Sequence, residues 1–287
     1  LPLHPSESVP RHLIRQLAYR VAWGNDRAAR VTPQHLVAFA LLTHARRGLE
    51  RERLLERVGF IVSYLTARGA LLSDPLADPL REKGLAAEPE RVDLVGSALA
   101  RPVDEVVRLF AREKLVRLKE FGDDWVISLE EGGRSALDYH KNGILHHFVD
   151  DALLATVALR LLRDGPFPDE ALAVEGRLLS RVLKLEFVYG ATGYDAAVEA
   201  AVRRFLRDGL LRRDGEDRLF ADRDAREALE FFAMAIRPFL EAYRIVARAS
   251  MAPGAPVNEK DLVKASLRLG RRMFSVGEVE LPESVNA

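Results

Sequence analysis

The hydrophobic pattern of the chain changes from a helical to a strand period at two places, and this feature most constrains its fold. Apolar residues recur at three- and four-residue steps over 103–115, the spacing of one helix face. Over 115–129 they alternate on either side of a turn at 122–124, which predicts a β-hairpin. A tighter hairpin follows a second helical stretch at 210–220. The pattern therefore predicts a mainly α-helical region with two small β-hairpins.

The two hairpins belong to a longer similarity within the chain. Leu36-Val37-Ala38 with Gly48 matches Leu153-Leu154-Ala155 with Gly165, 117 residues further on; Val107, Phe110 and Leu115 match Val202, Phe205 and Leu210 at an offset of 95. We predict an internal repeat of winged-helix-like units, each a set of helices followed by a hairpin. The alternative is chance similarity between amphipathic helices, since helical periodicity alone produces such matches.

This repeat divides the chain into four segments. Residues 1–30 form an N-terminal helix, 31–152 a first helical unit with hairpin 115–129, 153–250 a second unit with hairpin 210–220, and 251–287 a C-terminal tail. In the first unit, Thr32 and Pro33 predict the start of a helix, as N-cap and first helical residue. Residues 70–90, which contain three prolines, are predicted to be a long surface connection.

Charge and composition exclude several function classes. The chain has 43 basic and 43 acidic residues, so there is no basic excess of the kind that nucleic-acid binding usually needs. It has no cysteine, which excludes disulfides, thiolate catalysis and cysteine-ligated zinc. Its longest apolar run, 36–42, is seven residues, too short to span a bilayer. Any membrane contact is therefore expected to be peripheral.

A stand-alone winged-helix module that binds nucleic acid or a protein partner is the alternative function. Its recognition helix would be 103–114 or 197–208, where Arg108, Arg112, Arg203 and Arg204 supply positive charge. Acidic residues occur on the same segments and offset that charge, so we expect a solvated surface and no nucleic-acid partner.

One sequence, His146 to Asp151, has the H-x-x-x-x-D form in which a histidine can act as general base and an aspartate can orient it. On a continuous helix the two side chains would point about 140° apart. Neighbouring His140, His147 and Asp150 offer at most one convergent pair, so no metal site is expected. We therefore predict no catalytic residue, no metal and no cofactor.

Two stretches resemble the bacterial glycerol-3-phosphate acyltransferase family and its dihydroxyacetone-phosphate relatives. Residues 31–49, VTPQHLVAFALLTHARRGL, resemble the family's "VTP…LVA…LL…RRGL" segment downstream of the catalytic domain. Residues 139–148, YHKNGILHHF, are similar to its "YYxNxxLHxF" helix, with His140 where an aromatic is usual. Gly277-Glu278-Val279 and Pro282-Glu283 look like its "GxIxxPEA" close. The resemblance extends loosely along the whole chain.

The resemblance implies the C-terminal helical region of a glycerol-3-phosphate 1-O-acyltransferase, an enzyme of phospholipid biosynthesis. The family's catalytic motifs precede the "VTP" segment, so His146 and Asp151 would match H-x-x-x-x-D by coincidence, and this region would be inactive alone. Tyr139, Asn142 and His146 are its candidate binding residues.

The chain begins at Leu1 rather than Met, and we expect a piece of a longer protein in which 1–30 leads from a missing catalytic domain. The expected partners are that domain, acyl-CoA or acyl carrier protein, and the cytoplasmic face of the cell membrane.

Overall fold

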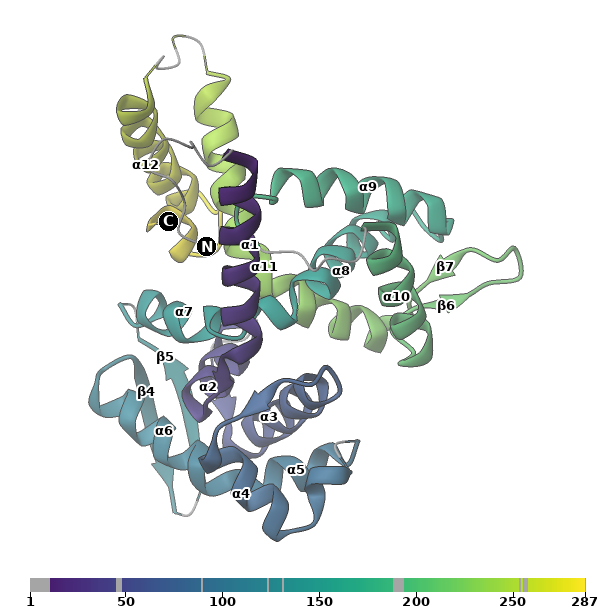
Figure 1. The fold of residues 1–287 in the computed structure, drawn as a ribbon. Helices are drawn as coiled ribbons and strands as arrows, with labels where there is room; N and C mark the ends of the chain where they lie inside the picture. The colour runs from purple at the N-terminus through teal and green to yellow at the C-terminus, as the bar shows by residue number, and fades with distance from the viewer. Residues whose placement is uncertain are drawn as a thin grey trace, which may run out of the picture.

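The computed structural model of the chain describes residues 11–44, 48–88, 90–122, 124–130, 132–187, 194–252, 254 and 258–286. Its elements are α1 (Arg11–Ala28), β1 (Arg30–Val31), α2 (Pro33–Leu42), β2 (Gly48–Glu50), α3 (Arg51–Thr66), β3 (Leu71–Leu72), α4 (Asp74–Glu82), η1 (Leu85–Ala87), α5 (Val92–Ala98), α6 (Ala100–Arg112), β4 (Val116–Phe121), β5 (Asp124–Leu129), α7 (Arg134–Asn142), η2 (Leu145–His147), α8 (Val149–Leu161), α9 (Asp169–Val182), α10 (Tyr194–Arg207), β6 (Arg212–Arg213), β7 (Leu219–Phe220), α11 (Arg223–Ser250), α12 (Glu259–Ser275) and α13 (Glu283–Asn286) (Figure 1). The prediction of a mainly helical fold with two small hairpins is confirmed.

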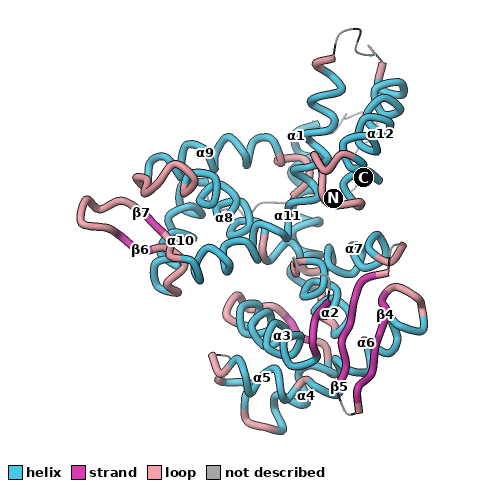
Figure 2. The backbone as a smooth tube through the Cα atoms, turned by 180° about the vertical axis from the view of Figure 1, so that it is seen from behind, coloured by secondary structure: helices cyan, strands magenta, loops and turns pink. Residues whose placement is uncertain are grey.

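The first half of the molecule, α2 to β5, is built around a three-stranded sheet. Thr32 begins α2 as predicted, because its Oγ1 accepts a hydrogen bond from the backbone N–H of His35 at 3.4 Å. The sheet has the order β2-β5-β4 with antiparallel pairs, and Figure 2 shows it beside α6. Trp125 and Ile127 of β5 are buried in the core.

The prediction of a surface connection over 70–90 is wrong, because the segment contains α4 and η1. Leu76 and Leu80, four residues apart, lie on one face of α4 and are buried. Pro75 lies in the first turn, where its missing N–H breaks no intrahelical bond. Pro79 lies further inside the helix, and the burial of the two leucines offsets its cost. Because of these two prolines, the sequence pattern did not predict the helix.

The second half, α8 to β7, has a similar order of elements on a smaller scale. The order is α8, the bridge residue Phe167, α9, α10 and then the hairpin of β6 and β7. Phe167 forms an antiparallel bridge with Leu219 of β7, as β2 pairs antiparallel with β5. Lys114 and Gly209 follow α6 and α10 with φ values of 58° and 72°. The strands β6 and β7 are two residues each. The duplication and the winged-helix assignment remain predictions.

The segment 251–287, predicted to be a tail, contains α12 and α13 and packs against α11. The buried carboxylate of Glu241 on α11 accepts hydrogen bonds from the backbone N–H of Leu281 (3.0 Å) and the hydroxyl of Ser284 (2.9 Å). Arg134 on α7 donates two 2.8 Å hydrogen bonds to Glu283. These contacts fix the C-terminal residues to both α7 and α11.

Helix α1 exposes its apolar face. Leu13, Ile14, Leu17 and Val21 share one side of the helix and are between 46% and 64% exposed. None of the described helices combines the length and the apolarity that crossing a bilayer requires.

Candidate functional site

The three candidate binding residues lie on α7 and η2 but do not form one set. Tyr139 is 79% exposed on α7. Asn142, at the end of the same helix, donates its side-chain amide to Asp138 at 3.0 Å. His146 lies in η2 and is half-buried. Among the described residues no hydrogen bond or ring contact joins these three side chains, and their role in binding remains a prediction.

Four histidines from three elements gather where α7 meets α2. His35 of α2 lies so close to Gly143 that a Cβ there would be 2.7 Å from its Nε2. Burial lowers the pKa of His35, and His140 and His146 lower it further. The rings of His146 and His147 are 4.0 Å apart, and burial lowers the pKa of His147 to about 4, assisted by His146 and Arg68. His147 is therefore neutral near pH 7.

The polar residue that organises this region is Asp151 of α8, which is 2% exposed. Its carboxylate forms close ion pairs with Arg68, in the turn that follows α3, and with Arg204 of α10. It also accepts a 2.9 Å hydrogen bond from the hydroxyl of Tyr64 on α3. The Tyr64 ring stacks on Phe148 at 4.5 Å. We name Asp151, Arg68, Arg204 and Tyr64 the Asp151 centre. It joins α3 of the first half to α8 and α10 of the second half.

The Asp151 centre determines what the H-x-x-x-x-D sequence does. The stretch is not one continuous helix, because η2 ends at His147 and α8 begins at Val149. Between them, Arg68 and Arg204 bind both oxygens of the Asp151 carboxylate. His146 instead faces Asp26 of α1. Burial lowers the pKa of His146, and the negative charge of Asp26 opposes that lowering. An aspartate engaged in this way does not orient a catalytic histidine.

Sequence reasoning did not identify Arg68, Tyr64 or Arg204 as partners of Asp151. Arg204 was noted as a basic residue of a possible recognition helix, but its charge is used inside the molecule. Arg68 lies four residues after Tyr64, in the turn that follows α3, and its guanidinium lies 3.4 Å from the centre of the Tyr64 ring. This spacing was the available signal.

A groove of about 1750 Å³ runs over the described surface. Residues from α3, α8, α9 and α11 line it, and α3 and α9 lie on opposite sides of α8 and α11 (Figure 1). Several of its charges are paired, including Arg160 with Glu175 and Arg237 with Glu280. Its apolar lining includes Leu178, Leu179, Val182 and Leu240. A wide groove with this mixed lining suits a protein segment better than a small molecule.

Arg57 of α3 is the exceptional cation of this groove. It donates hydrogen bonds to the backbone oxygen of Ala40 (3.2 Å) and the hydroxyl of Thr43 (2.9 Å), and its guanidinium lies 5.0 Å from the centre of the Phe231 ring. Within the described part of the chain no carboxylate pairs with it. Burial lowers its pKa to about 10. A carboxylate brought into the groove would compensate this desolvated charge.

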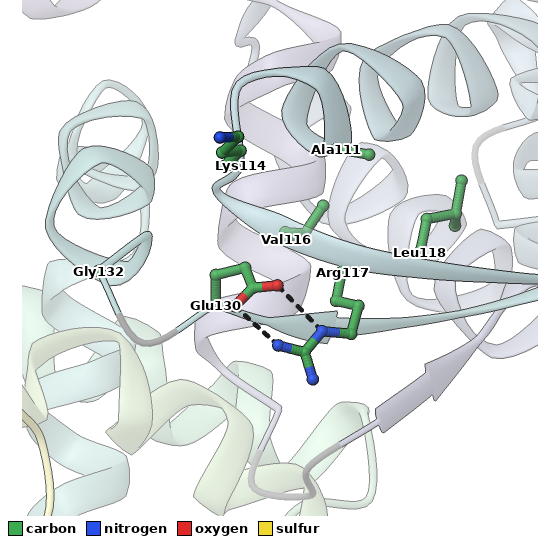
Figure 3. A pocket seen from close by; sticks show the side chains of 7 residues that line it. All are labelled: Ala111, Lys114, Val116, Arg117, Leu118, Glu130 and Gly132. Atoms are coloured by element: carbon green, nitrogen blue, oxygen red, sulfur yellow. Dashed lines mark hydrogen bonds and ion pairs between the residues drawn. The ribbon is translucent and has the colours of Figure 1, made fainter.

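A smaller hollow of about 530 Å³ lies where α6 meets β4 and β5. Figure 3 shows Arg117 and Glu130 facing each other across the two strands, joined by hydrogen bonds of 3.0 and 3.1 Å, with Lys114 directed away from them. Among the described residues, this pairing leaves Lys114 as the cation of the lining without a carboxylate partner. No group of three or more histidine, aspartate or glutamate side chains in the described residues could hold a metal ion.

Comparison with known proteins connects this geometry to one family. A family model described as the C-terminal region of glycerol-3-phosphate acyltransferase matches residues 4–287. Curated relatives named glycerol-3-phosphate acyltransferase match 94% of the chain: that of Shewanella amazonensis is 25% identical, that of Histophilus somni 23% and that of Pasteurella multocida 22%. The chain spans 30% of the length of these relatives.

Proposed function

Because the chain belongs to the family of glycerol-3-phosphate acyltransferase C-terminal regions, we propose that it is the non-catalytic part of such an enzyme. The enzyme transfers an acyl group from acyl-CoA or acyl carrier protein to the first hydroxyl of glycerol 3-phosphate. The match of residues 4–287 to the family model carries this proposal. The relatives, at more than three times the matched length, have room for a separate catalytic domain.

The non-catalytic role is supported by the Asp151 centre. A general-base histidine needs a carboxylate free to hold its ring in one tautomer. Asp151 is buried and held by two arginines and a tyrosine, so it joins helices and does not assist His146. The residues that bind the acyl and glycerol phosphates then lie in the catalytic domain, which we propose as the principal partner.

We also propose that the enzyme works at the cytoplasmic face of the membrane as a peripheral protein. Helix α1 supports this, because its exposed apolar face is accompanied by four arginines and one aspartate in its sequence. Basic amphipathic helices of this kind bind the interface of anionic bilayers. The test is flotation with anionic and with neutral vesicles: binding to the anionic vesicles that Leu17→Glu weakens is expected, and equal binding by the variant would contradict the role of α1.

A nucleic-acid-binding role receives less support from the geometry. Asp104 of α6 accepts two hydrogen bonds from Arg51, at 3.0 and 2.8 Å, and Arg101 pairs with Glu105. These carboxylates neutralise charge where phosphate contacts would be needed. We therefore propose no nucleic-acid partner.

The experiment is a radiolabelled acyl-transfer assay with glycerol 3-phosphate and either acyl-CoA or acyl carrier protein thioester. We expect product from the complete gene product that contains residues 1–287 and none from residues 1–287 alone. His146→Ala in the complete gene product is expected to leave kcat unchanged, because His146 has no catalytic task; a change in KM alone would fit its candidate role in binding. Turnover by residues 1–287, or an inactive complete gene product, would contradict the proposal.

A further inference from the structure

Helix α9 carries an apolar stripe that nothing in the described structure covers. Val174, Leu178 and Val182 follow one another at steps of four residues and are 68%, 65% and 43% exposed; Leu185, in the turn after the helix, is 84% exposed. The three helical residues lie on one face over about two turns, roughly 12 Å. Exposed apolar residues that are contiguous, in contrast to scattered ones, mark an interaction surface.

The first half shows how the same face is used when it has a partner. The predicted internal repeat has an offset of 117 residues. When this offset is applied to α3, Ile61 corresponds to Leu178 of α9 and Leu65 corresponds to Val182. Ile61 and Leu65 are fully buried, whereas Leu178 and Val182 are 65% and 43% exposed. Helix α9 buries Leu172 and Gly176 and packs against α8 and α10, so Leu178 and Val182 form a second apolar face that no described element covers.

The stripe borders the groove, and the two features make one surface. Leu178 and Val182 line the groove from α9, while Arg57 lines it from α3. A ridge of residues spaced four apart packs against another helix. A helix laid in this groove would cover the leucine and valine and could bring an acidic side chain to Arg57.

We propose that this surface, formed by the α9 stripe and the groove with Arg57, docks an amphipathic helix of the catalytic domain of the same polypeptide. The inference rests on the proposed function. The occupant has an apolar face for Leu178 and Val182 and a carboxylate for Arg57.

Two observations favour this occupant over others. The larger part of each relative lies outside the match, so a covalently linked partner of sufficient size exists in the family, and linkage gives it a high effective concentration. The sequence of α9 contains Asp169, Glu170 and Glu175 against two arginines, which disfavours an anionic bilayer as the occupant.

The test is photo-cross-linking of the complete gene product with p-benzoylphenylalanine in place of Leu178. The matched control carries the same residue in place of Val263, which is 52% exposed on α12. After irradiation, the linked peptides are identified by mass spectrometry, and acyl transfer is measured on the same preparation. We expect a link from position 178 to a peptide that precedes residue 1, with a yield several-fold above that of the control.

Each other outcome overturns the inference. A link between two copies would make the surface a dimer contact, a link to lipid would make it a membrane contact, and a link within residues 1–287 would mean that the chain covers it itself. A yield no higher than that of the control would mean that the stripe is open. If the enzyme is active and gives any of these results, the docking is refuted and the proposed function stands. If the enzyme is inactive but gives the expected link, the proposed function is refuted and the docking stands.

Discussion

The predicted repeat pairs helix α3 with helix α9, yet apolar residues that α3 buries correspond to apolar residues that α9 exposes. In α3 this face includes Ile61 and Leu65, which are fully buried; in α9 it includes Leu178 and Val182. The two helices have the same spacing of apolar residues, so the pattern alone does not decide burial. What differs is whether a described element covers this face: α9 packs against α8 and α10 on another side and leaves Leu178 and Val182 uncovered.

The largest effect is expected where the two halves are joined. Asp151→Asn leaves Arg68 and Arg204 without their counter-charge in a buried site, and we expect it to lower the free energy of unfolding by about 3–5 kcal/mol. Urea unfolding followed by circular dichroism measures this. The control is Glu175→Gln, whose pair with Arg160 is largely exposed and is expected to contribute about 0–1 kcal/mol. Similar losses in both variants would contradict a structural role for the Asp151 centre.

The second prediction compares the two helices directly. Ile61→Ala removes buried methyl groups and is expected to cost about 2–5 kcal/mol of unfolding free energy. Leu178→Ala truncates an exposed side chain and is expected to change it by roughly 0.5 kcal/mol or less in residues 1–287. The same urea titration tests both. Equal costs would show that α9 is already packed as α3 is.

The third prediction turns from stability to activity. In the complete gene product, Leu178→Glu places a charge in the proposed docking surface, and we expect acyl transfer to fall roughly ten-fold, which corresponds to about 1.4 kcal/mol. Val263→Glu on α12 serves as the matched control and is expected to change the rate by less than about two-fold. If the two variants behaved alike, α9 would have no special part in the enzyme.

The smallest effect concerns pH. His147, beside the Asp151 centre, has its pKa lowered by burial from 6.5 to about 4, so protonation favours the unfolded chain. The neutral ring of His147 makes its full contribution to the free energy of unfolding above pH 6.5. That contribution is lost as the pH falls from 6.5 toward 4. His35 and His146 act in the same direction, while Asp150, whose pKa burial raises, opposes them.

His147→Gln should therefore reduce the slope of unfolding free energy against pH in this interval. Urea midpoints between pH 7 and pH 4 measure that slope. An unchanged slope would mean that the ring of His147 is solvated in the folded protein.

The sequence was informative where local chemistry decides structure. The change of period predicted both hairpins, and Thr32 with Pro33 predicted the start of α2. The sequence pattern does not predict α4, because Pro75 and Pro79 are residues that usually break a helix. Local signals succeed when the residues that decide the structure are close together in the chain.

The candidate site could be predicted much less well. Asp151 meets Arg68, Tyr64 and Arg204 across separations of 83, 87 and 53 residues, and no spacing rule connects positions so far apart. The burial of Arg57 and the exposure of Leu178 likewise depend on which helices pack together. The candidate residues Tyr139, Asn142 and His146 come from a resemblance, and within the described structure no hydrogen bond or ring contact joins their side chains.

Hydroxyl-radical footprinting of the complete gene product tests most directly whether α9 keeps its apolar face for a partner. The modification rate of Leu178 is compared with that of Val263, since the two are 65% and 52% exposed in residues 1–287. Docking of the catalytic domain predicts that Leu178 reacts several-fold more slowly than Val263. Equal or faster modification of Leu178 would contradict it.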